Sequence, residues 1–132
     1  MKYISTRNKE KIVSISEAII QGLADDGGLY IPQALDQKVD LVSTLKMSYL
    51  ELAQYILSLF LSDFSHEQIQ QCVQNAYQNS FENNEVAPLR KYSDGWLMEL
   101  WHGPTSAFKD VALTLLPHLL TTAYQNQNEH DL

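Results

Sequence analysis

Three serine-headed capping boxes set the starts of three helices in this sequence. In such a box a serine hydroxyl accepts a hydrogen bond from the backbone N–H three residues on. A glutamate or glutamine at that later position reaches back to the N–H of the serine. The boxes are Ser14–Glu17, Ser48–Glu51 and Ser65–Gln68. We therefore predict a short helix that ends near Leu23 and, later in the chain, two longer helices.

Apolar residues recur with helical periodicity after the second and third boxes. The first stripe is Leu52, Ala53, Ile56, Leu57 and Phe60, and the second is Ile69, Cys72, Val73, Ala76 and Tyr77. We interpret both stripes as core. Cys72 is the only cysteine, so it cannot form an internal disulfide, and no cation lies within helical reach to activate it. A buried structural thiol in a reducing cytoplasm is expected.

Short extended segments are predicted around these helices. Lys2–Ser5 is typical of an edge strand, and Leu29–Ile31 of a second strand that follows a turn at Asp26–Gly28. Asp94–Gly95 is a tight-hairpin signal. The segment Trp96–Trp101 is apolar enough for a strand that is covered on both faces.

The last helix is expected to begin near Ser106 or Ala107 and to run to about Tyr124. Pro117 lies inside it, and proline lacks the backbone N–H and clashes with the preceding turn. A kink or a restart of the helix is therefore predicted at this point. The polar tail 125–132 is interpreted as a surface connection.

Lys109 is the strongest candidate for a catalytic residue in this sequence. It follows a Gly-Pro turn, a Thr-Ser pair and a phenylalanine, and it precedes the apolar run Val111–Leu120. Apolar surroundings lower the pKa of an ammonium group and make the neutral amine accessible. A neutral amine can attack a carbonyl carbon, which makes Lys109 a candidate Schiff-base lysine. The alternative is an ordinary solvated lysine near a helix start.

Three segments of the chain resemble one enzyme family. Gly103–Asp110, which reads Gly-Pro-Thr-Ser-Ala-Phe-Lys-Asp, resembles the lysine motif of the threonine synthases. Gly22–Pro32 resembles the family's Gly-Leu-Ala-x-Asp-Gly-Gly-Leu-Tyr-x-Pro segment, and Lys2–Arg7 is similar to its first strand. The lysine motif alone would indicate only the wider group of fold-type II pyridoxal-phosphate enzymes. The Gly-Gly-Leu-Tyr segment narrows the resemblance to threonine synthase.

The resemblance implies a reaction and a cofactor. Threonine synthases carry out a β,γ-replacement that converts O-phospho-L-homoserine and water to L-threonine and phosphate. Pyridoxal 5′-phosphate is the electron sink, and the motif lysine, Lys109 here, holds it covalently. Once displaced by the substrate amine, that lysine can move protons on the substrate carbons. Lys109 is thus the predicted catalytic residue as well as a cofactor-binding one.

The resemblance also implies an α/β fold and an incomplete one. Residues 1–84 would form the helix-rich N-terminal domain, and residues 85–132 the start of a catalytic domain with a tryptophan-synthase-β-like fold. At 132 residues the chain is much shorter than the family, so an N-terminal fragment is expected. It would lack the Ser-Gly-x-Thr-Gly loop for the substrate carboxylate and the loop for the cofactor phosphate. On its own it is therefore predicted to be inactive.

The neighbours of Lys109 have two interpretations each. Phe108 could wall the cofactor pocket or be a core aromatic, and we favour the core. Thr105 and Ser106 could contact the cofactor or the substrate phosphate, or cap the last helix, and capping is favoured for one of them. Asp110 is expected to be structural, because a helix dipole favours a carboxylate in the first turn.

Two further polar features are interpreted as structural. His102 could be a general acid near the substrate phosphate, but a satisfied packing residue is the favoured role. The turn Asp25–Gly28 is acidic and would repel phosphate, so it is expected to support the fold. The remaining histidines, His66, His118 and His130, do not stand at metal-ligand spacing from Cys72 or from carboxylates, which argues against zinc.

Charge and hydropathy exclude several other classes of function. The net charge of −7 argues against nucleic-acid binding. No apolar run reaches transmembrane length, and the N-terminus lacks a secretory signal.

Two alternatives stay open: another fold-type II lyase, such as a dehydratase or a phospho-lyase paralogue, and a non-catalytic N-terminal packing module. Exposed apolar surface on Trp96–Leu100 or on the 107–120 helix would favour self-association.

Overall fold

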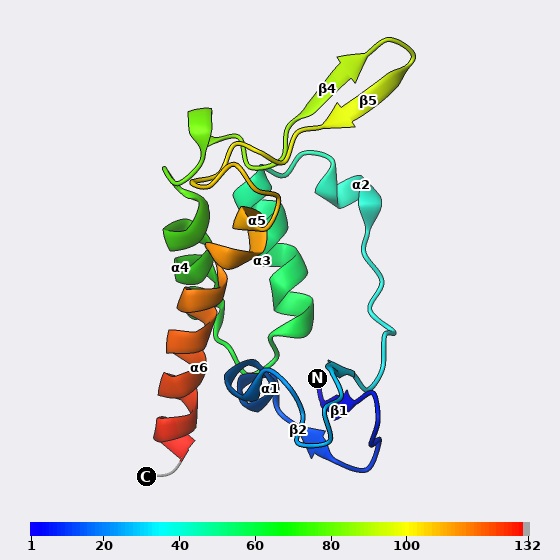
Figure 1. Cartoon of the computed structure of the whole chain (residues 1–132), viewed down its shortest axis with the longest axis vertical. Helices are drawn as coiled ribbons and strands as arrows, with labels where there is room; N and C mark the ends of the chain where they lie inside the picture. The colour runs from blue at the N-terminus through cyan, green and yellow to red at the C-terminus, as the bar shows by residue number, and fades with distance from the viewer. Residues whose placement is uncertain (131–132) are drawn as a thin grey trace.

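The computed structural model describes residues 1–130 as a bundle of helices flanked by a small sheet and a projecting hairpin (Figure 1). The elements in chain order are β1 (Tyr3–Ser5), β2 (Ile12–Val13), α1 (Ile15–Gln21), β3 (Tyr30–Pro32), α2 (Leu41–Thr44), α3 (Tyr49–Phe60), α4 (His66–Tyr77), a 3₁₀ turn η1 (Glu82–Asn84), β4 (Leu89–Tyr92), β5 (Gly95–Met98), α5 (Asp110–Leu113) and α6 (Leu116–His130). None of these helices is long and apolar enough to cross a membrane.

All three capping boxes are confirmed. Ser14 Oγ accepts from the N–H of Glu17 at 3.1 Å, and the Glu17 carboxylate accepts from the N–H of Ser14 at 2.7 Å. The same reciprocal pairs open α3 and α4. Helix α1 ends at Gln21, slightly before the predicted Leu23, because Gly22 takes a φ of 70° that stops the helix.

The small sheet is antiparallel and has the order β2-β1-β3. Tyr3 pairs with Val13 on one side and with Pro32 on the other. The first strand is therefore central, and the prediction of an edge strand at Lys2–Ser5 is wrong. All three residues of β1 are buried, and Ser5 is 0% exposed.

Helix α4 carries the centre of the core, as its apolar stripe predicted. All five stripe residues are buried, and Val73 is 0% exposed. Helix α6 lies alongside α4 and brings the fully buried Ala123 into the same core (Figure 1). The Tyr77 hydroxyl donates to the carbonyl of Val111 at 2.7 Å, and burial raises the pKa of that phenol. Cys72 is buried, as predicted, and burial also raises the pKa of its thiol.

The apolar stripe on α3 is less buried than the stripe on α4. No residue of α3 is fully buried, although its apolar residues stand at the same helical spacing as those of α4. Leu57 and Ala53 pack against the core from its margin. The prediction that this stripe forms core is therefore wrong as to full burial, since all five stripe residues are only half-buried.

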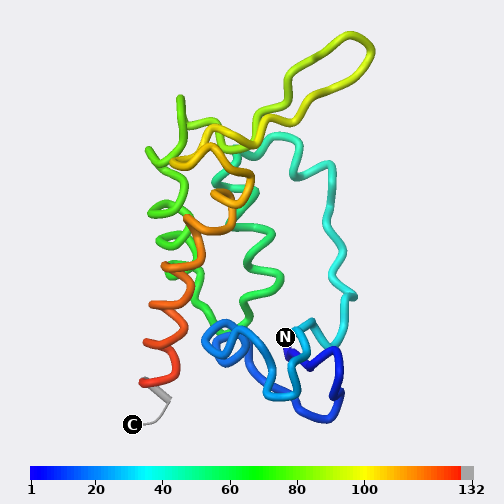
Figure 2. Tube along the Cα trace, viewed as in Figure 1, coloured from blue at the N-terminus to red at the C-terminus, as the bar shows by residue number. Residues whose placement is uncertain are grey.

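The hairpin predicted from Asp94–Gly95 is confirmed, with Lys91 opposite Trp96 and Leu89 opposite Met98. It projects away from the helices (Figure 2), and every residue of both strands is exposed. Trp96 is 69% exposed. The expectation of a strand covered on both faces is therefore wrong for this chain, since no described segment packs against either face.

The predicted last helix is divided in two. Helix α5 begins at Asp110, a few residues later than expected, and α6 begins at Leu116, which confirms a restart near Pro117. Proline is tolerated in the first turn of α6 because its missing N–H would have no helical partner there. Helix α6 continues to His130, so the interpretation of the polar tail as a surface connection is wrong up to that residue. Residues 131–132 lie outside the described part of the chain.

Candidate functional site

Lys109 stands at the N-cap position of α5, with helical backbone angles. Its side chain is exposed, and among residues 1–128, whose side chains the structure describes, no carboxylate forms an ion pair with its amine. The apolar run after it turns a different side toward the core, where Leu115 is buried. The expected apolar surroundings of Lys109 are therefore absent from this chain. The amine is open to a ligand that approaches from solvent.

The loop Gly103–Asp110, which we call the lysine loop, is tightly folded. The Ser106 N–H donates to the Gly103 carbonyl at 3.1 Å, and the Asp110 N–H donates to the Ala107 carbonyl at 3.0 Å. Ser106 takes a φ of 58°, in the left-handed region. A Cβ added at Gly103 would lie 2.5 Å from the Asp110 Cβ. Glycine is therefore required there by close approach to the Asp110 side chain.

Asp110 is the buried polar residue of the lysine loop, at 4% exposure. Its carboxylate accepts from the Thr105 N–H at 2.7 Å and from the Thr105 hydroxyl at 2.6 Å. These bonds, led by the hydroxyl, hold the pKa of the Asp110 carboxyl below its usual value. Asp110 thus has the structural role expected of it. No side chain caps α5, so the capping role favoured for Thr105 or Ser106 is wrong.

Phe108, Ser106 and Lys109 of the lysine loop are all exposed. Phe108 is 65% exposed, so its favoured interpretation as a core aromatic is wrong for this chain. Both donors of Thr105 are already bound to Asp110. Of the two hydroxyls considered as cofactor contacts, the one on Ser106 is therefore the freer.

His102 precedes the lysine loop and is held by two carboxylates. Its Nε2 lies 2.7 Å from Oε2 of Glu99, and its Nδ1 lies 3.2 Å from Oε2 of Glu82. The Glu82 N–H also donates to the His102 carbonyl at 2.9 Å. Arg90 bonds Glu85 and lies 3.7 Å from Glu99. Both ring nitrogens of His102 thus have hydrogen-bond partners, in line with the favoured structural role, and the residue ties the start of the loop to η1 and to the hairpin base.

The glutamates around His102 were not anticipated. Glu82 lies 20 residues before His102, and no periodicity in the sequence connects the two. Glu99 lies three residues before His102, a spacing that would have been a signal only if this segment were helical.

We expect the contacts of His102 to strengthen at low pH. Hydrogen bonds to Glu99, and next to Glu82, raise the pKa of His102 above its ordinary 6.5. A raised histidine pKa adds stability that is fully present below the unfolded pKa and disappears as pH rises through the folded pKa. An NMR titration of the His102 ring should therefore have a midpoint above 6.5.

The substitution Glu99→Gln should lower that midpoint, because it removes the first of the two carboxylates. Glu67→Gln makes the same chemical change on α4 and should leave the His102 midpoint where it is. A His102 midpoint that does not respond to Glu99→Gln would contradict this account of the ion pair.

The second motif, Gly22–Pro32, holds the small sheet together. The Asp26 carboxylate accepts from Ser5 Oγ at 2.8 Å and from the Gly28 N–H at 2.8 Å. These bonds, with the Gly28 N–H first, hold the pKa of Asp26 below its usual value. A Cβ at Gly28 would lie 2.2 Å from Ser5 Oγ. The turn lies at the end of the molecule opposite the hairpin (Figure 1), and its predicted structural role is confirmed.

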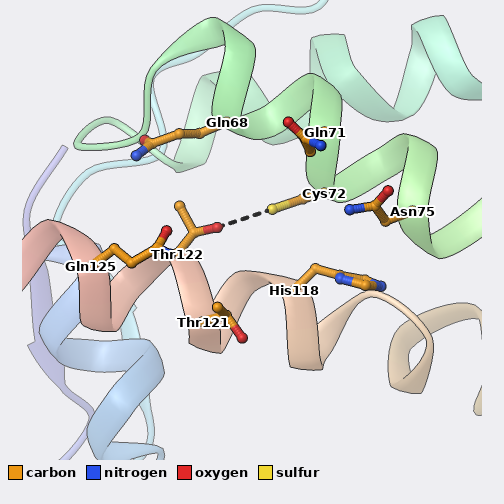
Figure 3. Close-up of a pocket in the computed structure, with 8 residues that line it drawn as sticks. All are labelled: Gln68, Gln71, Cys72, Asn75, His118, Thr121, Thr122 and Gln125. Atoms are coloured by element: carbon orange, nitrogen blue, oxygen red, sulfur yellow. Dashed lines mark hydrogen bonds between the residues drawn. The ribbon is translucent and has the colours of Figure 1, made fainter.

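A cavity of about 330 Å³ lies between α4 and α6 (Figure 3). The residues around it are mostly amides and hydroxyls: Gln68, Gln71, Cys72, Asn75, His118, Thr121, Thr122 and Gln125. The Cys72 thiol lies 3.4 Å from the Thr122 hydroxyl on its wall. No residue of the lysine loop lines this cavity, so it contributes nothing to the chemistry of Lys109.

Comparisons with known proteins agree on one family. Residues 2–77 match a family model described as threonine synthase N terminus. Threonine synthase of Pseudomonas aeruginosa is 35% identical over 133 residues, which cover 98% of this chain and 28% of that protein. The yeast enzyme from Saccharomyces cerevisiae is 38% identical, over 96% of this chain and 26% of its own. The chain thus spans about a quarter of the length of these relatives.

A comparison with solved structures indicates the same family. The crystal structure of PLP-bound threonine synthase from Brucella melitensis superposes with a TM-score of 0.88 at 35% identity. The match covers 97% of this chain and 28% of that one. The expected mixture of helices and strands, and its correspondence to one part of a larger fold, are both confirmed.

Proposed function

Since the chain belongs to the threonine synthase family, we propose that Lys109 is the lysine that holds pyridoxal 5′-phosphate in a threonine synthase. The observation that carries this proposal is the placement of Lys109. It lies at the end of an ordered loop with the family's motif, and its amine is exposed and free of acidic partners within the described residues. Covalent attachment of an aldehyde needs such an amine.

The reaction proposed for the whole enzyme consumes O-phospho-L-homoserine and water and releases L-threonine and phosphate. When bound, the cofactor supplies an electron sink for negative charge on the substrate carbons. Lys109 holds the cofactor first and later, as a free amine, takes and returns protons on the substrate carbons. One mobile amine on one face of the substrate is sufficient for successive proton transfers.

The residues of the lysine loop fit a cofactor on the solvent side. Phe108 offers an exposed ring, and Ser106 a hydroxyl, on the same loop as Lys109. We assign these two side chains to contacts with the cofactor, and we assign to Thr105 the support of the loop through its bonds to Asp110. Asp110 is the one acidic residue of the loop, and both of its carboxylate oxygens accept hydrogen bonds from Thr105.

We divide the chain, as part of this proposal, into an N-terminal domain at residues 1–84 and the start of the cofactor domain at 85–132. The two segments share one hydrophobic core in this structure: Leu115 and Ala123 pack in the same cluster as Tyr3 and Val73. Helix α6, which follows the lysine loop and α5, therefore packs against the N-terminal helices α1 and α4. The buried free thiol of Cys72 suits a reducing compartment, and we place the protein in the cytoplasm.

The proposed function is tested by comparing two polypeptides with pyridoxal phosphate and O-phospho-L-homoserine. One is this chain alone, and the other is this chain joined to the matching remainder of the Pseudomonas enzyme. Phosphate release and threonine formation are expected from the joined polypeptide. The chain alone should hold the cofactor weakly and show no turnover. Robust threonine formation by the chain alone, or none by a folded, cofactor-loaded joined polypeptide, would contradict the proposal.

The exposed hairpin leads us to expect self-association of the chain when it is alone. Tyr92, Trp96 and Met98 are each more than half exposed, and both hairpin faces are free of described neighbours. Sedimentation velocity at rising protein concentration should show dimers or larger species.

Trp96→Ser should reduce the fraction of these species several-fold, because it removes the largest exposed apolar side chain. Leu35→Ser, at a residue 75% exposed but outside the hairpin, is the matched control. Equal effects of the two variants would count against the hairpin.

A further inference from the structure

Asp110 holds a carboxylate almost entirely out of water beside the residue that we assign to the cofactor. The residue is 4% exposed, whereas Lys109, its neighbour in the chain, is exposed. Buried carboxylates need hydrogen-bond donors, because the charge loses its hydration. Here the two closest donors belong to Thr105, through its N–H at 2.7 Å and its hydroxyl at 2.6 Å. The backbone N–H groups of Ala107 and Ser106 also help to lower the pKa of the Asp110 carboxyl.

We propose that Asp110 is the positioning residue of Lys109: its carboxylate binds Thr105 and thereby closes the lysine loop into one conformation that presents the amine. This inference rests on the proposed function of Lys109. It assigns no contact with the cofactor to Asp110, which acts through the backbone on either side of Lys109.

The surrounding geometry is built for this contact. Gly103 lies so close to the Asp110 side chain that a Cβ would sit 2.6 Å from the carboxylate oxygen Oδ2. Ser106 lies between Thr105 and Asp110 in the chain and adopts a left-handed φ of 58°. A non-glycine residue in this region is held there by its surroundings. The loop backbone therefore bends around the Asp110 carboxylate.

A simple helix-dipole role does not account for these contacts. Helix α5 has only four residues, and a short helix has a weak dipole. The two carboxylate oxygens bond to an upstream loop residue, Thr105, which is five positions away. The backbone of Asp110 makes the helical contacts: its carbonyl accepts from the Thr114 hydroxyl at 2.7 Å. Side chain and backbone of Asp110 therefore hold the loop and the helix together at Lys109.

The test measures amide hydrogen exchange by NMR on the 132-residue chain with three substitutions. Asp110→Asn removes the charge that accepts from Thr105. Thr105→Val removes only the hydroxyl donor and keeps the size of the side chain. Asp94→Asn makes the same chemical change as the first variant in the exposed hairpin turn. Amides of α4 report on the stability of the whole fold.

Exchange of the Thr105 amide should rise about tenfold or more in Asp110→Asn, because a hydrogen bond to a charged group is lost. The heteronuclear NOE of the Lys109 amide should fall in the same variant. Thr105→Val should lower that NOE as well, and Asp94→Asn should change neither measurement. In the supporting outcome, exchange in α4 stays within twofold of the original chain.

Two results would overturn the inference. One is a Thr105 amide and a Lys109 NOE that stay unchanged in Asp110→Asn. The other is that both Asp110→Asn and Thr105→Val increase amide exchange by the same factor in α4 as in the lysine loop. In that case Asp110 would stabilise the whole fold and would have no specific effect on the loop. Attachment of pyridoxal phosphate, fixed by borohydride and located by mass spectrometry, tests Lys109 separately. Failure there removes the proposed function and leaves the loop measurement intact.

Discussion

Lys109→Ala is expected to abolish covalent attachment of pyridoxal phosphate and to lower phosphate release by the joined polypeptide at least about 10³-fold. Alanine has no amine, so neither the attachment nor the later proton transfers can take place at this position. The visible absorbance of the lysine-bound cofactor should disappear together with turnover. Absorbance spectra and a phosphate-release assay on the same samples check both expectations.

Lys91→Ala is the matched control for this result. Lys91 is an exposed lysine on β4, outside the lysine loop, and its removal makes the same chemical change. The cofactor band and the rate of phosphate release should both remain. A cofactor band that persists in Lys109→Ala, or disappears in Lys91→Ala, would move the attachment site away from Lys109.

Ile69→Ala should strongly destabilise the fold. Ile69 is 2% exposed and lies in the core that joins α4 to α6. Truncation of a buried isoleucine to alanine costs about 2–5 kcal/mol, because apolar contact is lost and a cavity remains. Such a loss is a large part of the stability of a domain of this size.

Urea unfolding followed by circular dichroism measures this cost. Gln70→Ala, at the exposed neighbour of Ile69, removes a side chain from the same helix without opening the core. Its unfolding midpoint should stay close to that of the original chain. If Ile69→Ala leaves the midpoint unchanged, then α4 does not carry the centre of the core.

The features that local sequence predicted correctly depend on residues a few positions apart. Each capping box needs only a serine and a side chain three residues later, and the three boxes start α1, α3 and α4 as expected. The Asp94–Gly95 turn needs only two adjacent residues to connect β4 and β5. Such interactions form in the same way wherever the rest of the chain lies.

Burial could not be predicted in the same way. The stripes of α3 and α4 have the same periodicity, yet the residues of one are half-buried and those of the other are in the core. Trp96 on β5 is as apolar as a covered strand requires and is nevertheless 69% exposed. A stripe or an alternating pattern states which side of an element prefers to be covered. Whether it is covered depends on which distant segment packs there.

The features of the candidate site also fall into those that the sequence determined and those that the tertiary structure decided. The sequence alone determined the family, the starts of α1, α3 and α4 and the identity of Lys109 as the candidate lysine, because these depend on residue types at short, definite spacings. Only the tertiary structure decided that β1 is central and that the Lys109 amine is exposed. It also decided that the Thr105 hydroxyl and N–H bind Asp110 and that Glu82 reaches His102. The physical reason is that exposure and long-range hydrogen bonds are set by the packing of separate segments, which no short stretch of sequence contains.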